Sequence, residues 1–361
     1  MLMLGGPILH GAMLHAPHLL FQTIDLASAS FRMGAFFAIS GLLAGLNLRR
    51  RPPRVWLARH VKRVGIPALF GVAVLSPITS LVLRTELPAA AASRIVLFDW
   101  YHLWFLYALL VYGGLTYLAF TFLGRRTLAR AVAIAIARSV GQGGVLFYLS
   151  TLGFLLLMTT PTIVAVMPAQ YGRIAMQLAQ IAAFAPLYGF GIWMACSRSI
   201  RGLMLRTWRL PAGVLACSAV GYLVWYGVVR LRLPPETFAN WDIIVRFAGE
   251  AICPPAASLL ILRSALRIRR IGPWTKSLCA VSFTLYLLHF PMLAVVNAAL
   301  LRTKLHYLAV YVVAVTATTI ACIAIHFGLV SRSAWLSLLL NGRSINRQPN
   351  QSARALVTTA G

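Results

Sequence analysis

Acidic residues are scarce in this 361-residue sequence, which has only six Asp and Glu side chains against 33 Lys and Arg. Charged residues of both signs make up 11% of the chain, whereas a soluble domain carries about 25%. Together with 60% hydrophobic residues, this composition excludes a soluble globular protein. Apolar segments of about 20 residues recur along the chain and are too long for barrel strands, so they indicate an all-α, polytopic membrane protein.

Cysteine pairs with metal-ligand or redox spacing are also missing. The five cysteines lie in or beside apolar segments and form no CxxC sequence: Cys196, Cys217, Cys253, Cys279 and Cys322. They are typical of small packing residues, so we expect no disulfide, no metal site and no bound cofactor. The first apolar segment lacks a basic n-region and a small-residue cleavage site, which argues against a cleavable signal peptide.

The apolar segments predict ten transmembrane helices, at approximately residues 2–21, 30–47, 64–84, 101–123, 145–167, 174–196, 211–230, 243–263, 277–301 and 307–330. Basic residues cluster in alternate connections, namely 48–63, 124–140, 197–210, 263–276 and the segment after 330. By the positive-inside rule, these connections and both termini are cytoplasmic. The basic residues are spread over several connections rather than one soluble face, which argues against nucleic-acid binding.

The six acids support this topology independently. In the ten-span arrangement, five of them lie in or beside outer connections and Glu250 lies in the outer half of the eighth span; the five are Asp25, Glu86, Asp99, Glu236 and Asp242. We predict one membrane domain over residues 1–338 and a polar, disordered cytoplasmic tail over 339–361. The segment 127–139 is apolar, short and arginine-containing, and we expect it to lie along the inner membrane surface or to extend the fifth span.

Several polar side chains fall within predicted spans, where they are energetically expensive. His10 follows Met1 by nine residues, which is about 14 Å along a helix and close to mid-bilayer. Arg32 begins the second span and His289 lies inside the ninth. Each has a structural alternative, because a histidine can donate to a backbone carbonyl of a neighbouring helix and an arginine can extend to the headgroups.

For the other polar and aromatic residues in or near the spans, we favour a structural role over a catalytic one. Arg246 and Glu250 are one helical turn apart in the eighth span, so they can pair with each other, either as a structural clasp or in a site. His60 and His306 are expected in loops, and buried structural contacts are expected for His15, His18 and His326. Trp100, Tyr101 and Trp104 are typical of an interfacial aromatic belt.

Five short motifs occur in an order that is similar to a known family: LMLGGPILH (2–10), FRMGAFFAISGLL (31–43), RVGIPAL (63–69), HLWFL (102–106) and SFTLYLLHFP (282–291). The chain resembles the membrane acyltransferase 3 family in these segments, while spans five to eight agree in hydropathy alone. The likeness is greatest to the branch that succinylates periplasmic glucans. It implies ten core helices and transfer of an acyl group from cytoplasmic acyl-CoA to an acceptor at the outer face.

The resemblance also implies roles for individual residues. The histidine that matches His10 is the catalytic base, and the basic residues before the third span, here Arg59, Lys62 and Arg63, hold the acyl donor. Only Arg63 lies within a matching motif. Family members carry a short segment with Asp and Arg before the first span, whereas this sequence begins inside that span, which points either to a start further upstream or to the loss of a donor contact.

The chemistry of acyl transfer fits these positions. A sugar hydroxyl attacks a thioester slowly unless a base removes its proton, and a neutral imidazole can do so. The thioester oxygen gains negative charge, which Arg32, His102 or Trp104 could stabilise. We place these three, together with Glu250 and His289, on the acceptor or oxyanion side of the site. The phosphates of CoA match the basic segment 48–63.

The sequence therefore predicts an O-acyltransferase of the bacterial inner membrane, with the lipid bilayer, acyl-CoA and an envelope glycan as its partners. Succinyl is the favoured acyl group and acetyl the alternative. A secondary transporter would also place His, Arg and Glu in the membrane, but no paired halves with matching broken helices are found. A non-catalytic scaffold would not explain why His10 and Glu250, which are energetically unfavourable in a membrane, are present in the spans.

Overall fold

The computed structural model describes residues 28, 31–86, 95–122, 141–167, 172–268, 272–300, 303 and 305–343. In these ranges the chain forms helices and connections, without a strand. The helices are α3 (Arg32–Leu48), α4 (Pro53–Phe70), η2 (Gly71–Leu75), α5 (Ser76–Glu86), η3 (Tyr101–Leu103), α7 (Trp104–Phe122), α9 (Gly141–Val166), α10 (Gly172–Cys196), α11 (Arg198–Leu205), α12 (Arg209–Gly227), η5 (Val229–Leu231), α13 (Pro235–Arg267), α14 (Pro273–Leu300), α15 (Tyr307–Ile325), η6 (His326–Val330) and α16 (Ala334–Asn341).

The all-α fold is confirmed, and eight of the ten predicted spans coincide with helical segments that are long and apolar enough to cross a membrane. The predicted span 30–47 corresponds to α3, which is apolar but has only 17 residues. The predicted span 2–21 lies outside the described residues. The total of ten and the orientation of the termini therefore stay predictions.

Helix α4 differs from the sequence prediction because it begins at Pro53 instead of residue 64. Proline is favoured at the first position of a helix, where its missing N–H leaves no hydrogen bond unmade. Beyond Phe70 the helix continues through the π-helical turn η2 into α5. Hydropathy marks only the apolar part of this helix, so Arg59, Lys62 and Arg63 lie on a helix and not in a loop.

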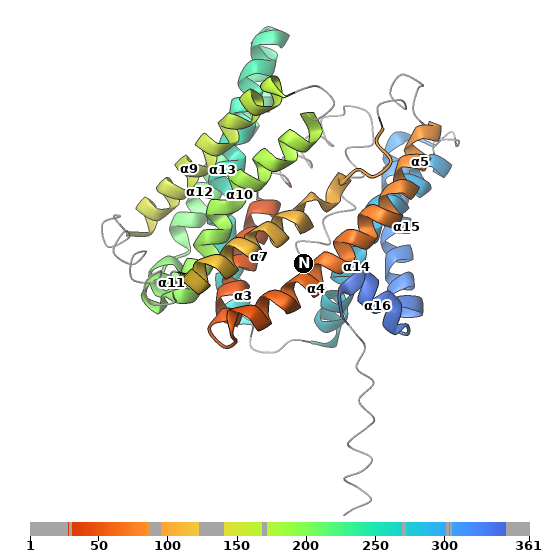
Figure 1. Ribbon diagram of the computed structural model, residues 1–361. Coiled ribbons are helices and arrows are strands. Elements are labelled where there is room, and N and C mark those ends of the chain that lie inside the picture. The colour runs from red at the N-terminus through yellow and green to blue at the C-terminus, as the bar shows by residue number, and fades with distance from the viewer. Residues whose placement is uncertain are drawn as a thin grey trace, which may run out of the picture.

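The helices form two groups on either side of a central layer (Figure 1). One group contains α9, α10, α11, α12 and α13, and the other contains α5, α14, α15 and α16, with α3, α4 and α7 between them. A continuous hydrophobic core joins these parts, and it includes Phe37 of α3, Phe105 of α7, Met194 of α10 and Leu285 of α14. The central layer thereby holds the first residues of α3 and α7 in fixed positions.

Glycines allow α3 and α10 to approach each other closely. A Cβ atom at Gly41 would overlap the backbone carbonyl of Tyr188, and one at Gly191 would overlap the carbonyl of Ala38. Small residues at such a crossing bring backbones into contact in the way that is typical of membrane helices. This contact fixes the axis of α3 and therefore the position of Arg32 at its start.

Arginine side chains donate hydrogen bonds to the last carbonyls of helices on the side of the bundle where α3 joins α4. Arg49 donates to the carbonyl of Ala195 at 3.1 Å, and Arg201 donates to the carbonyl of Met194 at 3.2 Å, both in the last turn of α10. Arg263 donates to the carbonyl of Arg206, at the end of α11. Terminal helix carbonyls lack partners in their own helix and carry partial negative charge, so these three arginines have a structural role.

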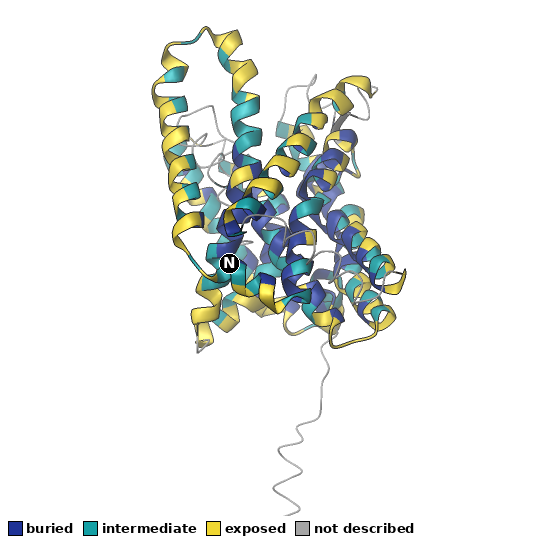
Figure 2. Ribbon diagram, turned by 90° about the vertical axis from the view of Figure 1, so that its left-hand side faces the viewer, coloured by how far each residue is buried: buried dark blue, intermediate teal, exposed yellow. Residues whose placement is uncertain are grey.

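Exposed and buried positions divide as expected for a protein in lipid. Buried residues line the interior of the bundle and exposed residues cover its outer faces (Figure 2). Many of the exposed side chains are large and apolar, including Leu69, Leu81, Phe147 and Leu223. A contiguous apolar exterior of this size would be unstable in water. This apolar surface is therefore expected to face the lipid bilayer.

Candidate active site

Two buried histidines from distant parts of the sequence lie next to each other. His102 is in η3, just before α7, and His289 is in α14; the centroids of their rings are 4.9 Å apart in an edge-to-face arrangement. His289 is completely buried and His102 is 8% exposed. The structure therefore brings together two of the five residues that the sequence placed on the acceptor side.

The hydrogen bonds of His289 define which ring nitrogen carries the proton. Its Nδ1 atom lies 2.6 Å from the carbonyl oxygen of Tyr286 and 3.2 Å from that of Leu285, on the preceding turn of α14. A carbonyl oxygen can only accept, so Nδ1 must be the N–H donor. In the neutral ring, Nε2 then carries the lone pair and can accept a proton or a hydroxyl hydrogen bond.

Tyr286 links the two histidines, since its hydroxyl donates to the backbone carbonyl of His102. Its ring also packs edge-on against the ring of His102, with centroids 5.4 Å apart. The charge of Arg32 acts on both Tyr286 and His289, which places this guanidinium within electrostatic reach of the pair. The cluster of Arg32, His102, Tyr286 and His289 is called the histidine cluster below.

The turn before His102 has an unusual backbone. Tyr101 has φ of 39°, in the left-handed region that non-glycine residues seldom adopt. Its hydroxyl lies 2.8 Å from the hydroxyl of Ser80, and its ring packs against Phe290 beside His289. Backbone in this conformation persists where surrounding contacts hold it, often at functional sites. Tyr101 is therefore half-buried and shapes the turn that presents His102.

The other two aromatic residues of the predicted belt are half-buried and pack against neighbouring rings. Trp100 stacks on Tyr107, with ring centroids 4.5 Å apart. Trp104 packs against the rings of Phe37 and Phe184, at centroid distances of 6.0 and 6.1 Å, and these two rings also contact each other. Trp104 thus faces the core between α3 and α10, and the described contacts give it a packing role next to the histidine cluster.

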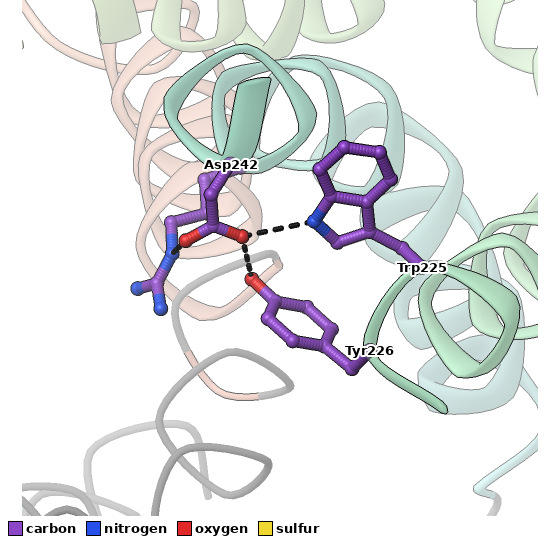
Figure 3. Close-up of polar contacts among 4 residues, drawn as sticks. Trp225, Tyr226 and Asp242 are labelled. Carbon is purple, nitrogen blue, oxygen red and sulfur yellow. Dashed lines mark hydrogen bonds and ion pairs between the residues drawn. The ribbon is translucent and has the colours of Figure 1, made fainter. Parts of the chain in front are cut away.

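Arg246 forms an ion pair with a residue that the sequence interpretation did not name as its partner. Arg246 bonds through Nε to Asp242 at 2.8 Å, one turn earlier in α13, and the other oxygen of Asp242 accepts from Trp225 Nε1 at 3.0 Å and Tyr226 Oη at 2.5 Å (Figure 3). Both Asp242 and Glu250 are one turn from Arg246, so spacing alone could not choose between them. The resulting Asp242 clasp joins the ends of α12 and α13.

Glu250 lies toward the same end of the bundle as Arg32. Gly34 of α3 is in direct contact with Pro254 of α13, so closely that a Cβ at Gly34 would overlap the proline ring. Both helices run in the same direction (Figure 1). Arg32 comes two residues before Gly34, and Glu250 comes four residues before Pro254. Both residues therefore lie on the N-terminal side of the contact between α3 and α13, at the same end of the two helices.

The three predicted donor residues lie on α4 together with His60. On α4 the ring of His60 faces α7, where Nε2 bonds to the Leu109 carbonyl at 2.9 Å and the ring stacks on Trp56. His60 is therefore a structural residue of a helix and not a loop residue. Lys62 and Arg63 follow Arg59 by three and four residues, so all three side chains start from the same side of α4. All three side chains are exposed.

His10, the predicted base, lies outside the described residues, as do His15 and His18. Of the remaining histidines, His326 is buried and contacts the Thr284 hydroxyl through Nδ1 at 2.8 Å. His306 caps the start of α15 by accepting from the N–H of Leu308. Within the described residues, no group of three or more His, Cys, Asp or Glu side chains could hold a metal ion.

The sequence contained signals for two residues that its interpretation missed. Tyr286 stands three residues before His289 in the motif SFTLYLLHFP, on the same helical face, so its proximity could have been predicted. Asp242 stands four residues before Arg246 and was a possible partner from the start. No local pattern signals the left-handed backbone of Tyr101, because tertiary contacts from α5 and α14 hold it.

The long apolar helices define a multi-pass membrane protein. Inside it lies a buried histidine cluster in which Nδ1 of His289 carries the proton and Nε2 the lone pair, an arrangement suited to proton transfer. Comparison with known families makes the assignment specific. The chain belongs to the acyltransferase 3 family, because the family described as an acyltransferase domain matches residues 2–327. This family membership agrees with the resemblance seen in the five motifs.

One curated relative is similar over a short region. Glucans biosynthesis protein C of Escherichia coli O6:K15:H31 (strain 536 / UPEC) is 36% identical over 92 residues, which cover 23% of this chain and 24% of the relative. The match therefore spans about a quarter of that protein. No solved structure matches the chain.

Proposed function

We propose that this protein is an O-acyltransferase of the bacterial inner membrane that moves an acyl group from cytoplasmic acyl-CoA to a hydroxyl of an envelope glycan. The observation that carries the proposal is the buried histidine cluster, in which Nε2 of His289 carries a lone pair next to His102 and within reach of the Arg32 charge. Family membership supports the acyl-transfer chemistry. The name of the curated relative favours a glucan as the acceptor. Succinyl is the favoured group because of the resemblance carried by the five motifs, with acetyl as the alternative.

In the proposed reaction, the acceptor hydroxyl attacks the carbonyl carbon of the acyl thioester. A neutral imidazole removes the hydroxyl proton as the new C–O bond forms. The C–S bond then breaks, and the leaving thiolate of CoA takes up a proton. His10 stays the proposed base, as the family resemblance implies, and Nε2 of His289 is placed to accept a hydrogen bond from the incoming hydroxyl.

Charge develops on the thioester oxygen during the attack, and a preorganised cation stabilises it most effectively in a site without water. Arg32 is the proposed group for this role, because its charge acts on the completely buried His289. His102 is proposed to orient the acceptor with His289. Glu250 is proposed to bind acceptor hydroxyls at the same end of the bundle, and Trp104 to support the cluster by packing.

Arg63, with Arg59 on the same face of α4, is the proposed contact of the donor phosphates. Arginine suits phosphate because its planar guanidinium forms paired, charge-assisted hydrogen bonds. Arg49, Arg201 and Arg263 are unsuitable for this role, since they are engaged with helix-end carbonyls. The donor and acceptor then approach the reaction centre from opposite ends of the bundle.

The assay that tests this function uses purified protein in detergent with succinyl-CoA or acetyl-CoA and a glucan acceptor. Release of free CoA thiol that depends on the acceptor is expected, together with a mass increase of the glucan by one acyl group. Mass spectrometry of envelope glycans from wild-type and deletion cells identifies the natural group. A secondary transporter would consume no acyl-CoA, and such a result with every donor would contradict the proposal.

A further inference from the structure

The last described helix, α16, ends directly on the helix that carries the proposed donor residues. Gly342 closes α16 in a left-handed conformation with φ of 60°. A Cβ atom added to Gly342 would overlap the Cα, carbonyl carbon and carbonyl oxygen of Arg63. The backbone of the α16 terminus is therefore seated on the backbone of Arg63, and a glycine is required there for both its conformation and its size.

Buried polar contacts fix α16 in this position. The side-chain oxygen of Asn341 accepts from the Thr284 hydroxyl of α14 at 3.0 Å, and the same hydroxyl lies 2.8 Å from Nδ1 of His326 in η6. Thr284 is completely buried. Since buried polar groups of this kind are costly to separate, the contacts tie α16 to α14 while Gly342 ties it to α4. Residues 339–341 of the predicted tail are thus part of the folded domain.

This arrangement brings two arginines together. Arg343 follows Gly342, and its guanidinium is close enough to that of Arg63 for the two charges to interact. Both side chains are exposed, so each can reach a ligand. Neither forms an ion pair within the described part of the chain, and the sequence has no acidic side chain between Asp25 and Glu86 or after Glu250.

Two like charges held in proximity by the backbone repel each other, and their repulsion is relieved when an anion binds between them. We propose that Arg63 and Arg343 together form a phosphate site that binds the phosphate groups of the acyl-CoA donor, with Gly342 as the residue that sets their spacing. This inference rests on the proposed function, to which it adds Arg343 as a donor-binding residue from the end of the domain. The sequence interpretation had assigned Arg343 to a disordered tail.

The same chemistry would also suit the phosphate of an anionic lipid headgroup. The donor is favoured because Arg63 is the one basic residue before the third span that lies in a family-like motif. The experiment therefore measures donor binding to protein in nanodiscs of purely zwitterionic lipid, and repeats the measurement with anionic lipid added.

Binding of non-hydrolysable acyl-CoA is to be titrated calorimetrically for the wild type, Arg343→Ala, Arg63→Ala and the control Arg332→Ala. Arg332 is another exposed arginine near the start of α16. We expect about a 10-fold or greater loss of donor affinity for Arg343→Ala and for Arg63→Ala, the usual worth of one charge-assisted contact. Arg332→Ala should bind like the wild type.

Thermal unfolding separates this role from a structural one. Without donor, Arg343→Ala should melt at or above the wild-type temperature, because a repulsion has been removed. With donor, it should gain less stabilisation than the wild type. A lower melting temperature with unchanged donor affinity would show that Arg343 is structural and would overturn the proposal.

The remaining outcomes are also decisive. If the wild type binds acyl-CoA and Arg343→Ala binds it equally well in zwitterionic lipid, the inference is wrong while the proposed function stands. If Arg343→Ala changes only the response to anionic lipid, the pair is a headgroup site and the inference is likewise wrong. If the wild type binds no acyl-CoA at all, the proposed function fails together with it.

Discussion

The hydroxyl of Tyr286 donates to the backbone carbonyl of His102, so that α14 holds the short helix η3 in place. The same tyrosine offers its own carbonyl to Nδ1 of His289 at 2.6 Å. One residue therefore positions His102 through its side chain and sets the tautomer of His289 through its backbone. This coupling explains how two histidines that are far apart in the sequence come to lie side by side.

Tyr286→Phe should lower acyl transfer while leaving the fold intact. The change keeps the ring and removes only the bond to His102, which costs about 1 kcal/mol of stability for a typical buried hydrogen bond. The control is Tyr112→Phe, which removes a tyrosine bond to the Ile181 carbonyl away from the cluster. Transfer should fall in the first variant and not in the second, at similar melting temperatures. Equal activities in both would show that His102 needs no such support.

His289 can be tested with two amides that differ in which nitrogen they replace. His289→Asn can keep a donor near the position of Nδ1, toward the Tyr286 carbonyl, but has nothing at the position of Nε2. His289→Gln can reach the position of Nε2 with a polar atom. If Nε2 accepts from the acceptor hydroxyl, transfer should fall by roughly 10- to 100-fold in the Asn variant, the cost of leaving one buried hydrogen bond unmade. It should fall less in the Gln variant.

The readout for His289 is the Michaelis constant for the glucan acceptor, measured at saturating acyl-CoA. Donor affinity should stay unchanged in both variants, because the proposed donor site is at the other end of the bundle. The role of His289 as an acceptor ligand would have to be abandoned if the Asn variant lost donor affinity while keeping its acceptor constant.

The Asp242 clasp should contribute to stability and not to chemistry. Asp242 is 16% exposed on its side chain and bonds to Trp225, Tyr226 and Arg246. Asp242→Asn removes the charge from these bonds, and bonds to a charged group are worth about 1.5–3 kcal/mol. We expect a lower melting temperature in detergent, with unchanged turnover below the transition. Glu236→Gln, an exposed acid near the start of the same helix, is the control, and a loss of turnover in Asp242→Asn alone would assign this carboxylate to the site.

Hydropathy predicted most of the fold because the bilayer requires about 20 apolar residues for each crossing helix. Eight spans were located in this way. The start of α4 at Pro53 was missed, because that part of the helix is too polar to give a hydropathy signal. Periodicity likewise could not decide between Asp242 and Glu250 as the partner of Arg246, since both lie one turn away.

Contacts between distant segments account for the rest of what the sequence could not reveal. The φ of Tyr101 is held by Ser80 and Phe290, which belong to other helices. The contact of Gly342 with Arg63 joins the end of the last described helix, α16, to α4. Arg32 and His289 could nevertheless be singled out as candidates, because a polar side chain inside an apolar span is a local signal that needs no tertiary information.

Orientation in the membrane can be tested by cysteine labelling at position 93, between α5 and η3, in a variant without native cysteines. The positive-inside rule places this connection on the outer face, so Ser93→Cys should react with an impermeant reagent in intact spheroplasts. A cysteine at position 51, in the arginine-rich connection between α3 and α4, should react only after lysis. The reverse pattern would invert the protein and would move the histidine cluster to the cytoplasmic half.

His10 is the residue on which the proposed mechanism depends most. Its predicted depth of about 14 Å from Met1 would place it where a donor from the cytoplasmic end and an acceptor from the opposite end can meet. His10→Ala should leave expression and acyl-CoA binding nearly unchanged, while acyl transfer falls by roughly 100-fold or more, the usual worth of a positioned acid–base group. His10→Asn is the sharper variant, because it keeps a polar side chain of similar size that cannot act as a base. Transfer at the wild-type rate by His10→Asn would reduce His10 to a packing residue, and His289, whose Nε2 carries a lone pair in the neutral ring, would become the first candidate for the base.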